Sequence, residues 1–468
     1  MIKYLILFLI CAVSSQSIAN DKIFIKLGQG KVAKSPMAVP PLQFFGNPNI
    51  QKDYSRIGSE MYRTLLNNLD VSYLFRFISQ SSYLEDPMKT SLRPKPFDRN
   101  GFDFSNWKKI GTEFMIRGGF KFIGNDVELE TYLYHVTTGE TLLSKKYRGP
   151  KSGGRAIAHK LSNDIIYRLT GKKGIFNTRV VVSSDRDSGC RKGQTKCNRI
   201  KEIYLMDWDG RNMQRITKHK SISISPAISP DGKTVAYTSF AYHPKMKMRN
   251  PDLFSYEVDT GKRYLLSYEK GVNSGAAFSP DGKHIFLTMS KKGNSDIYRM
   301  NKDGTKKIQL TRGPFGALNV EPAISNDGKK IAFSSDRHGS PKIYTMDING
   351  KNVKSVTPRA GRYNSTPSWS PDGKHIVFAG EDKGAFDIFL VTADGLKIER
   401  LTSAKKANGK RANNEDPSFS PDGRHIVFVS DRTGSRQVYI IGVDGQNERR
   451  ITVDHHNYFK PKWSKYLD

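Results

Sequence analysis

The pentapeptide Phe278-Ser-Pro-Asp-Gly282 decides the fold, because close copies of it recur along the second half of the chain. The copies are Ile228-Ser-Pro-Asp-Gly232, Ile324-Ser-Asn-Asp-Gly328, Trp369-Ser-Pro-Asp-Gly373 and Phe419-Ser-Pro-Asp-Gly423. Their aspartates lie at 231, 281, 327, 372 and 422, so successive copies are 50, 46, 45 and 50 residues apart. A repeat of this length is typical of propellers and solenoids.

Each repeat reads as four short antiparallel strands. The first strand ends in the Ser-Pro-Asp-Gly turn, where proline presets φ and glycine accepts a positive φ. A second strand follows, for example residues 374–378, and then a third, for example 343–347. The third strand ends at an Asp-Gly or Asn-Gly hairpin signal: Asp209-Gly210, Asp303-Gly304, Asn349-Gly350, Asp394-Gly395 and Asp444-Gly445. The fourth ends in a threonine: Thr217, Thr311, Thr357, Thr402 and Thr452. Such a unit is a propeller blade.

The two ends of the repeat region complement each other. The region begins at residues 179–185, which match a second strand, 331–336. It ends with Lys460-Pro-Lys-Trp-Ser464, which matches the first strand Thr366-Pro-Ser-Trp-Ser370. The last strand therefore supplies the inner strand of the first blade, which leaves no open edge. The sequence predicts an all-β six-bladed propeller over residues 174–468, closed by its C-terminal strand.

Residues 1–173 lack the repeat and predict two further segments. Residues 1–19 read as a secretory signal peptide, with Lys3 before an apolar run and a cleavage site near Ala19. The apolar run is too short for a stable membrane anchor, so we expect an exported protein that does not itself span a membrane. Residues 20–173 predict a small N-terminal α/β domain. Its amphipathic helices are expected at 53–69 and 156–169, and its strands at 74–78, 113–123, 127–136 and 141–147.

The cysteines and the net charge indicate the compartment of the protein and the kind of partner that it could bind. Cys190 and Cys197 lie in one basic loop, where export to an oxidising compartment favours a disulfide over free thiols. The chain has 76 basic and 45 acidic residues, a formal net charge of +31. Such an excess suggests a polyanionic partner. The export signal and the lack of a nucleic-acid-binding motif argue against nucleic acid, which leaves anionic envelope material or a merely solvated basic surface.

Strand parity places a set of asparagines at the channel mouth, on the face opposite the Ser-Pro-Asp-Gly turns. Each stands three residues before the proline position of its blade: Asn273, Asn319, Asn364 and Asn414. The residues that follow them complete a ring: Ser274, Gly275, Val320, Glu321, Thr366 and Glu415. Amides and carboxylates in a ring suit the grip of a polar loop or peptide. Local bracing of loops by the asparagines is an equally good interpretation.

The order of these features resembles one family. The signal peptide, the α/β domain, the join Leu169-Thr-Gly-Lys-Lys-Gly-Ile-Phe-Asn-Thr-Arg179, six blades and the ending Lys462-Trp-Ser-Lys-Tyr-Leu467 together resemble the TolB family. The resemblance implies a periplasmic, non-enzymatic adaptor of the Tol–Pal system without a cofactor. Such an adaptor links inner-membrane Tol proteins to the peptidoglycan-associated lipoprotein, Pal, and supports outer-membrane integrity and constriction at cell division.

The resemblance also implies two partner sites. The mouth would bind Pal, with Asn273 to Gly275 and Asn319 to Glu321 as the matching positions. The segment Asn20-Asp21-Lys22-Ile23-Phe24-Ile25 would bind TolA by strand addition. On its residues alone this segment is equally well an ordinary edge strand. Other Tol or outer-membrane proteins are further expected partners.

A different class of function is a propeller enzyme or a lectin that acts on cell-wall or polysaccharide ligands. It would need facing carboxylates at the mouth, for which Glu321, Glu415 and Asp416 are the candidates. The sequence lacks a Gly-x-Ser-x-Gly nucleophile motif and a glycine-rich phosphate loop. His284, His375 and His425 occupy one repeat position and are expected to be structural. The sequence therefore predicts no metal or catalytic residue.

Overall fold

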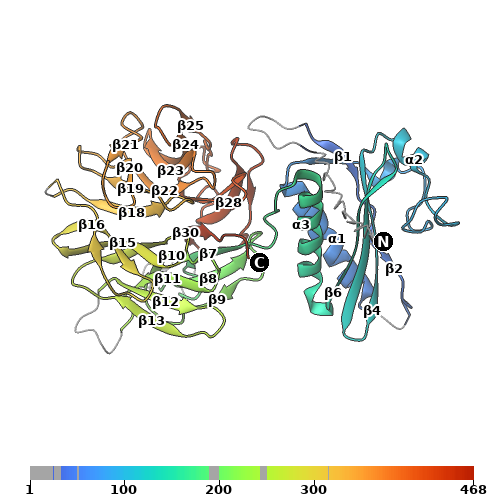
Figure 1. Ribbon diagram of the computed structural model, residues 1–468, viewed down its shortest axis with the longest axis horizontal. Coiled ribbons are helices and arrows are strands. Elements are labelled where there is room, and N and C mark those ends of the chain that lie inside the picture. The colour runs from blue at the N-terminus through green and yellow to red at the C-terminus, as the bar shows by residue number, and fades with distance from the viewer. Residues whose placement is uncertain are drawn as a thin grey trace, which may run out of the picture.

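The computed structural model describes residues 25, 33–49, 52–188, 200–242, 250–314 and 316–467. Figure 1 shows two domains side by side, with helices α1 and α3 between the N-terminal sheet and the propeller. The signal peptide and the candidate pair Cys190 and Cys197 lie outside the described residues. So does the expected TolA-binding segment, except for Ile25.

The N-terminal domain is the predicted mixed α/β domain. Its sheet has the order β3-β1-β4-β5-β6, with β2 paired to β4. β1 is parallel to β3 and β4, and β4, β5 and β6 form an antiparallel meander. The strands are β1 (Ser35–Ala38), β2 (Gln43–Phe44), β3 (Phe75–Phe77), β4 (Phe114–Ile123), β5 (Asp126–His135) and β6 (Glu140–Pro150). The helices are α1 (Tyr54–Val71), α2 (Phe104–Lys109) and α3 (Gly154–Thr170), besides two single 3₁₀ turns.

Helices α1 and α3 bury the apolar stripes that their sequences predicted. Ile57, Met61 and Leu65 of α1, and Ile157 and Leu161 of α3, belong to one hydrophobic cluster with the sheet. Helix α3 is followed by Gly171, which has the left-handed φ of 68° that favours glycine at a helix end. Within the described residues, no helix has the length and hydropathy of a transmembrane span.

The propeller has the six predicted blades of four strands each. Blade 1 is the composite sheet, in which β30 (Tyr458–Trp463) pairs with β7 (Arg179–Ser184), followed by β8 (Glu202–Asp207) and β9 (Gln214–Arg215). Blade 2 consists of β10 (Ser223–Ile228), β11 (Thr234–Ser239), β12 (Asp252–Glu257) and β13 (Arg263–Ser267), and blade 3 of β14 (Asn273–Phe278), β15 (His284–Lys292), β16 (Asn294–Asn301) and β17 (Ile308–Gln309).

The remaining three blades repeat the same antiparallel order. Blade 4 consists of β18 (Asn319–Ile324), β19 (Lys330–Ser335), β20 (Lys342–Asp347) and β21 (Lys354–Ser355). Blade 5 consists of β22 (Asn364–Trp369), β23 (His375–Asp382), β24 (Ala385–Thr392) and β25 (Ile398–Arg400), and blade 6 of β26 (Asn414–Phe419), β27 (His425–Ser430), β28 (Gln437–Gly442) and β29 (Arg449–Arg450). The C-terminal strand thus closes the ring, as the sequence predicted.

The Ser-Pro-Asp-Gly turn is a closed hydrogen-bonded unit. In blade 3, Ser279 Oγ donates to Asp281 Oδ1 at 2.5 Å, and Asp281 Oδ1 also accepts from the backbone N–H of Lys283 at 3.0 Å. Ser279 Oγ in turn accepts from the N–H of His284 at 2.9 Å. The serine and backbone donors hold the pKa of Asp281 below its usual value. The same serine–aspartate bond recurs at the equivalent turns of the other four copies.

The threonine that ends each fourth strand also has a repeated role. Its Oγ1 accepts the N–H of a third-strand residue at 2.8–2.9 Å in blades 1, 3, 4, 5 and 6. In blade 3, Thr311 Oγ1 accepts from Ile297 and donates to the buried Asp296 at 2.7 Å. The threonine therefore satisfies a buried donor and a buried acceptor at once.

Replacement of Thr311 by valine is expected to destabilise the propeller by about 2 kcal/mol, because the buried Ile297 N–H and Asp296 carboxylate lose their partner while the side-chain shape is kept. Urea unfolding measures the change. Thr433→Val makes the same substitution at an exposed site and should alter the free energy of unfolding by no more than about 0.5 kcal/mol. Equal effects of the two variants would contradict the assigned role.

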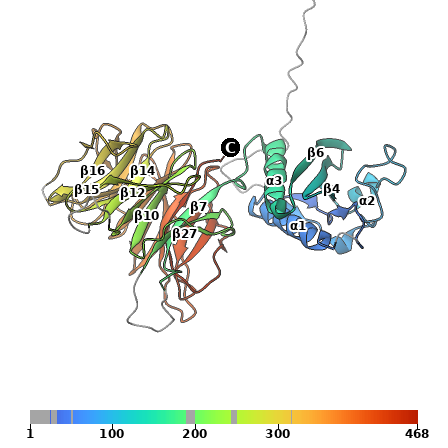
Figure 2. The same cartoon turned by 90° about the horizontal axis from the view of Figure 1, so that it is seen from below.

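The N-terminal domain docks on the turn face of blades 6 and 1. The buried His425 lies with Nε2 2.9 Å from Val71 O, and Arg424 donates to Ser72 O at 2.8 Å. Arg449 pairs with Asp70 at 2.7 Å, and Arg155 of α3 reaches Asp209 at 3.1 Å. Figure 2 shows the C-terminal end of the chain at the junction of the two domains. Since the asparagine-bearing ends of the first strands lie on the opposite face, docking leaves the channel mouth uncovered.

Candidate partner-binding site at the channel mouth

A β-bulge near the start of every first strand shapes the channel mouth. In each blade the pairing register between the first and second strands shifts by one residue. The residue at this position has a positive φ of 49–66° in all six blades: Ser225, Gly275, Glu321, Thr366, Asp416 and Lys460. Five of these are not glycine, and such backbone is costly unless the surroundings hold it. Bulges re-aim side chains, and here they form one ring of six equivalent positions.

An ion pair crosses the channel within this ring. Lys460 Nζ lies 2.6 Å from Glu321 Oε1 and 3.0 Å from Asp416 Oδ1. Glu321 belongs to blade 4, three blades away from blade 1, which carries Lys460. The opposite walls of the channel are therefore tied together. The second oxygen of Glu321 accepts from the backbone N–H of Thr366 at 2.8 Å, which fixes the carboxylate in place.

Burial and neighbouring charges set the protonation of the ring. Burial alone would lower the pKa of Lys460, but the carboxylates of Asp416 and Glu321 outweigh it and raise that pKa above its ordinary value. Burial alone would raise the pKa of Asp416, but the positive charge of Lys460 outweighs burial, and the pKa of Asp416 is lowered. Burial, with repulsion from Lys460, lowers the pKa of Lys462. Lys462 has no acidic partner within 4 Å among the described residues, so it can bind an acceptor from outside.

A cavity of about 330 Å³ opens at the mouth, and half of the residues of the predicted ring line it. Of the residues expected from the sequence, it is lined by Ser274, Gly275, Val320, Glu321 and Thr366. The cavity is also lined by side chains that the sequence analysis did not single out: Ser225, Tyr363, Lys460 and Lys462. It therefore combines an apolar and aromatic wall with a few fixed charges, as ligand sites commonly do.

The four ring asparagines do not reach this cavity, because their side chains are fully buried. Asn273 donates to Asp252 at 3.2 Å and to Glu269 O at 2.7 Å, and Asn319 donates to Asp296 at 3.0 Å. Asn414 donates to Asp387 at 2.8 Å, and Asn364 donates to Thr357 Oγ1 and Ala360 O, so each of the four asparagines bonds to the preceding blade or to the loop that leads from it. These side chains brace neighbouring blades against each other, and such bonds favour the bracing interpretation over direct contact with a ligand. Glu415 is also outside the cavity and pairs with Arg436 at 2.6 Å.

The cationic side of the mouth is what the sequence analysis missed. The match of Lys460-Pro-Lys-Trp-Ser464 to Thr366-Pro-Ser-Trp-Ser370 already placed Lys460 at the position of Thr366. Extending that match to the other blades would have aligned Lys460 with Glu321 and Asp416. The repeat therefore contains a signal for the charged ring, but this signal lies two residues after the asparagines and differs in residue type from blade to blade.

Exposed apolar side chains lie on the same face of the propeller as the mouth, and Tyr363 lines the mouth cavity itself. They lie in the loops that precede first strands or join second to third strands: Tyr242, Tyr268, Leu318 and Tyr363. Tyr363 is 43% exposed and packs edge-on against Phe386, with 5.7 Å between ring centroids. Aromatic side chains held in this way are enriched where proteins bind other proteins.

The architecture defines the class: a two-domain protein in which an α/β domain docks on one face of a six-bladed propeller, opposite the face that carries the channel mouth. Comparison with known proteins gives the family. The TolB amino-terminal domain matches residues 23–142, and the TolB beta propeller domain matches residues 166–410 and 363–467. The chain belongs to the TolB family, as its sequence suggested.

Curated relatives and a solved structure agree with this assignment. The chain is 31% identical over 289 residues to the Tol-Pal system protein TolB of Desulfosudis oleivorans, a match that covers 62% of this chain and 60% of that protein. It is 30% identical over 301 residues to the protein of that name from Rickettsia africae, covering 63% and 60%. The chain thus spans about 60% of the length of these relatives. The crystal structure of TolB from Acinetobacter baumannii shares the fold, with a TM-score of 0.74, 24% identity, and coverage of 92% and 97%.

Proposed function

We propose that this protein is a periplasmic, non-enzymatic adaptor of the Tol–Pal system. In this role the channel mouth holds the outer-membrane lipoprotein Pal, and the segment 20–25 engages TolA on the inner-membrane side. The link would support outer-membrane integrity and constriction during division. Family membership carries the general role, and the uncovered, pre-shaped mouth is the single observation that supports the Pal site.

The chemistry of the mouth suits a folded or looped protein partner. Lys462 offers a cation without an acidic partner among the described residues, and the ring presents fixed backbone and side-chain polar groups. Tyr363 in the cavity wall, and Tyr242 and Tyr268 on the same face, can contribute contact area at little cost in conformational entropy. The three candidate carboxylates of the enzyme alternative are already held in ion pairs: Glu321 and Asp416 with Lys460, and Glu415 with Arg436.

The proposed TolA segment ends at a residue that packs against the N-terminal domain. Ile25 is buried, and its N–H donates to Leu169 O at 2.9 Å at the end of α3. It shares a hydrophobic cluster with Trp208 and Trp463 of the propeller. Any partner that withdraws this segment must therefore break contacts beside the domain junction. If Pal binding favours one arrangement of that junction, TolA and Pal affect each other's affinity reciprocally.

A calorimetric titration of the chain lacking residues 1–19 with the soluble domain of Pal tests the proposal. The double variant Tyr363→Ala/Lys462→Glu is expected to bind at least about tenfold more weakly, because an aromatic contact and a cation are both lost at the mouth. The matched control is Leu396→Ala/Lys397→Glu, which removes an exposed apolar side chain and reverses one charge on the turn face of blade 5.

Each result has a definite meaning. Weakening by the mouth variant alone supports the site. If both variants and the parent bind with equal affinity, Pal is a partner but its binding site is not at the mouth. Absence of binding by the parent would overturn the adaptor function itself.

A further inference from the structure

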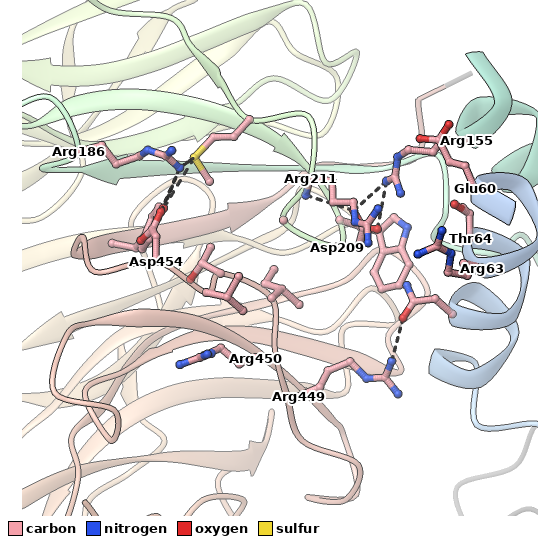
Figure 3. Close-up of a pocket in the computed structure, with 18 of the residues that line it drawn as sticks. Glu60, Arg63, Thr64, Arg155, Arg186, Asp209, Arg211, Arg449, Arg450 and Asp454 are labelled. Atoms are coloured by element: carbon pink, nitrogen blue, oxygen red, sulfur yellow. Dashed lines mark hydrogen bonds and ion pairs between the residues drawn. The ribbon is translucent and has the colours of Figure 1, made fainter. Parts of the chain in front are cut away.

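The junction between the two domains contains an arginine-lined cleft of about 680 Å³ (Figure 3). Helix α1 forms one wall with Arg56, Glu60 and Arg63, and Arg155 stands at the start of α3. The facing wall comes from blades 1 and 6, with Arg211, Arg449 and Arg450 among its residues. The cleft is separate from the channel mouth, with which it shares no lining residue.

The lining carries a strong excess of positive charge. It includes seven arginines and no lysine, against three acidic side chains, which is a formal excess of four positive charges. Four of the arginines are engaged: Arg56 with Asp53, Arg155 with Asp209, Arg186 with Asp454 and Arg449 with Asp70. The other three, Arg63, Arg211 and Arg450, are exposed and have no acidic partner within 4 Å in the described part of the chain.

Buried donors at the same walls are also unsatisfied. Trp208 Nε1, Arg155 Nε and Arg449 Nε are each buried without a hydrogen-bond acceptor among the described residues. Trp208 is fully buried, and Arg155 is 9% exposed. These N–H groups can only donate, and buried donors without an acceptor are rare in folded proteins. Like-charged guanidinium groups on both walls also repel each other, so the cleft has an excess of positive charge and of donors over the acceptors that face them.

We propose that this cleft binds a compact ligand with several phosphoryl groups, either a free polyphosphate ester or the phosphorylated headgroup of a lipid. Phosphoryl oxygens bring negative charge and many acceptors in a small volume, and guanidinium forks recognise them by paired N–H···O bonds. Arg63 from α1 and Arg450 from β29 would hold the ligand from opposite walls. The bound ligand would therefore bridge the two domains and stabilise their docked arrangement. The proposal does not depend on Pal or TolA binding.

Inorganic tripolyphosphate is the probe, titrated calorimetrically into the full chain lacking residues 1–19. We expect one saturable site, and at least about tenfold weaker binding by Arg63→Ala/Arg450→Ala, because two charge-assisted contacts are lost. Both arginines are exposed and have no acidic partner among the described residues, so the variant should fold normally. The control, Arg99→Ala/Arg359→Ala, removes one exposed arginine from each domain outside the cleft and should bind within about twofold of the parent.

Thermal unfolding gives a second readout. Saturating tripolyphosphate should raise the unfolding midpoint of the parent and the control but not of Arg63→Ala/Arg450→Ala, because only a bound ligand stabilises the native state. Dioctanoylglycerol pyrophosphate, a short-chain lipid with two phosphoryl groups, distinguishes the two sources. If it binds more tightly than tripolyphosphate, the ligand is a lipid headgroup, and if it binds more weakly, the ligand is a free ester. No saturable binding by the parent, an equal loss in both double variants, or equally tight binding of citrate would overturn the proposal.

Discussion

A chain that ends at Asp454 is expected to lose the cooperative unfolding of the propeller. Such a chain lacks β30, which supplies the innermost strand of blade 1 and pairs with β7 from Tyr458↔Ser184 to Trp463↔Val180. Its loss would expose the edge of β7 and open the ring between blades 1 and 6.

The size of the effect follows from the two aromatic residues of β30. Tyr458 is fully buried, and Trp463 is nearly so, with Nε1 donating to Thr178 Oγ1 at 2.8 Å. Both belong to the cluster that continues into the N-terminal domain. Removing each large core side chain costs about 3–5 kcal/mol, and the net stability of a domain is about 5–15 kcal/mol. The shortened chain should therefore unfold at least about 10 °C lower, or without a cooperative transition.

Complementation separates this explanation from a general loss of chain length. A peptide covering residues 455–468, added in trans, should restore a cooperative transition when scanning calorimetry is performed at saturating peptide. A peptide of the same composition in scrambled order should have no effect, because the apolar side chains would no longer face the core in register. A shortened chain that unfolds within about 2 °C of the full chain would show that β30 does not close the ring.

The fold could be predicted from the sequence because its signals are local and repeated. The Ser-Pro-Asp-Gly turn encodes its own hydrogen bonds, as Ser279 and Asp281 show, and five copies of the turn make the period unambiguous. The match between residues 460–464 and 366–370 then determines how the ring closes. The family assignment rests on the same order of elements and is confirmed.

The site was harder to predict because a ring brings distant residues together without any signal in their spacing. Glu321 and Lys460 are 139 residues apart and meet only because blades 1 and 4 are opposite each other. The asparagines are conspicuous because they recur, yet their recurrence reflects a common structural role, since Asn273 and Asn319 each bond their blade to the preceding one. Residues that differ between blades, such as Tyr363 and Lys462, give the mouth its chemistry. Likewise, the interdomain cleft depends on how α1 meets blades 1 and 6, which no single segment encodes.

Replacement of Lys460 by methionine is expected to destabilise the propeller by about 2 kcal/mol at neutral pH. The substitution leaves Glu321 and Asp416 close together in the channel without their cation. Removing one partner of a fully buried pair costs about 3–5 kcal/mol. The side chains of Lys460 and Glu321 remain 28% and 30% exposed, so solvent screening reduces the effect. Urea unfolding of the variant and the parent measures the difference.

Two controls distinguish the lost ion pair from the loss of a charge. Lys465→Met makes the same substitution at an exposed position at the end of the same chain segment, where the Lys465 ammonium donates to the amide oxygen of Asn326 at 2.5 Å. It should change the free energy of unfolding by less than about 0.5 kcal/mol. Glu321→Gln, added to Lys460→Met, should recover at least half of the loss, because it removes one of the two unpaired carboxylates. An unchanged loss in the double variant would contradict the trans-channel pair.

The pH dependence of stability is an independent test of whether the charge interaction between Lys460 and Asp416 stabilises the folded protein. In the parent, Lys460 lowers the pKa of Asp416, so the stabilisation is present above the unfolded-state pKa of about 3.9 and is lost as the pH falls through the lower folded-state value. In Lys460→Met, burial without the cation raises the pKa of the same carboxylate, so protonation stabilises the folded variant. The difference in stability between parent and variant should therefore be largest near pH 7 and shrink towards pH 4. A difference that stays constant over this range would mean that methionine acts through packing, and that the charges tying the mouth together contribute little to its shape.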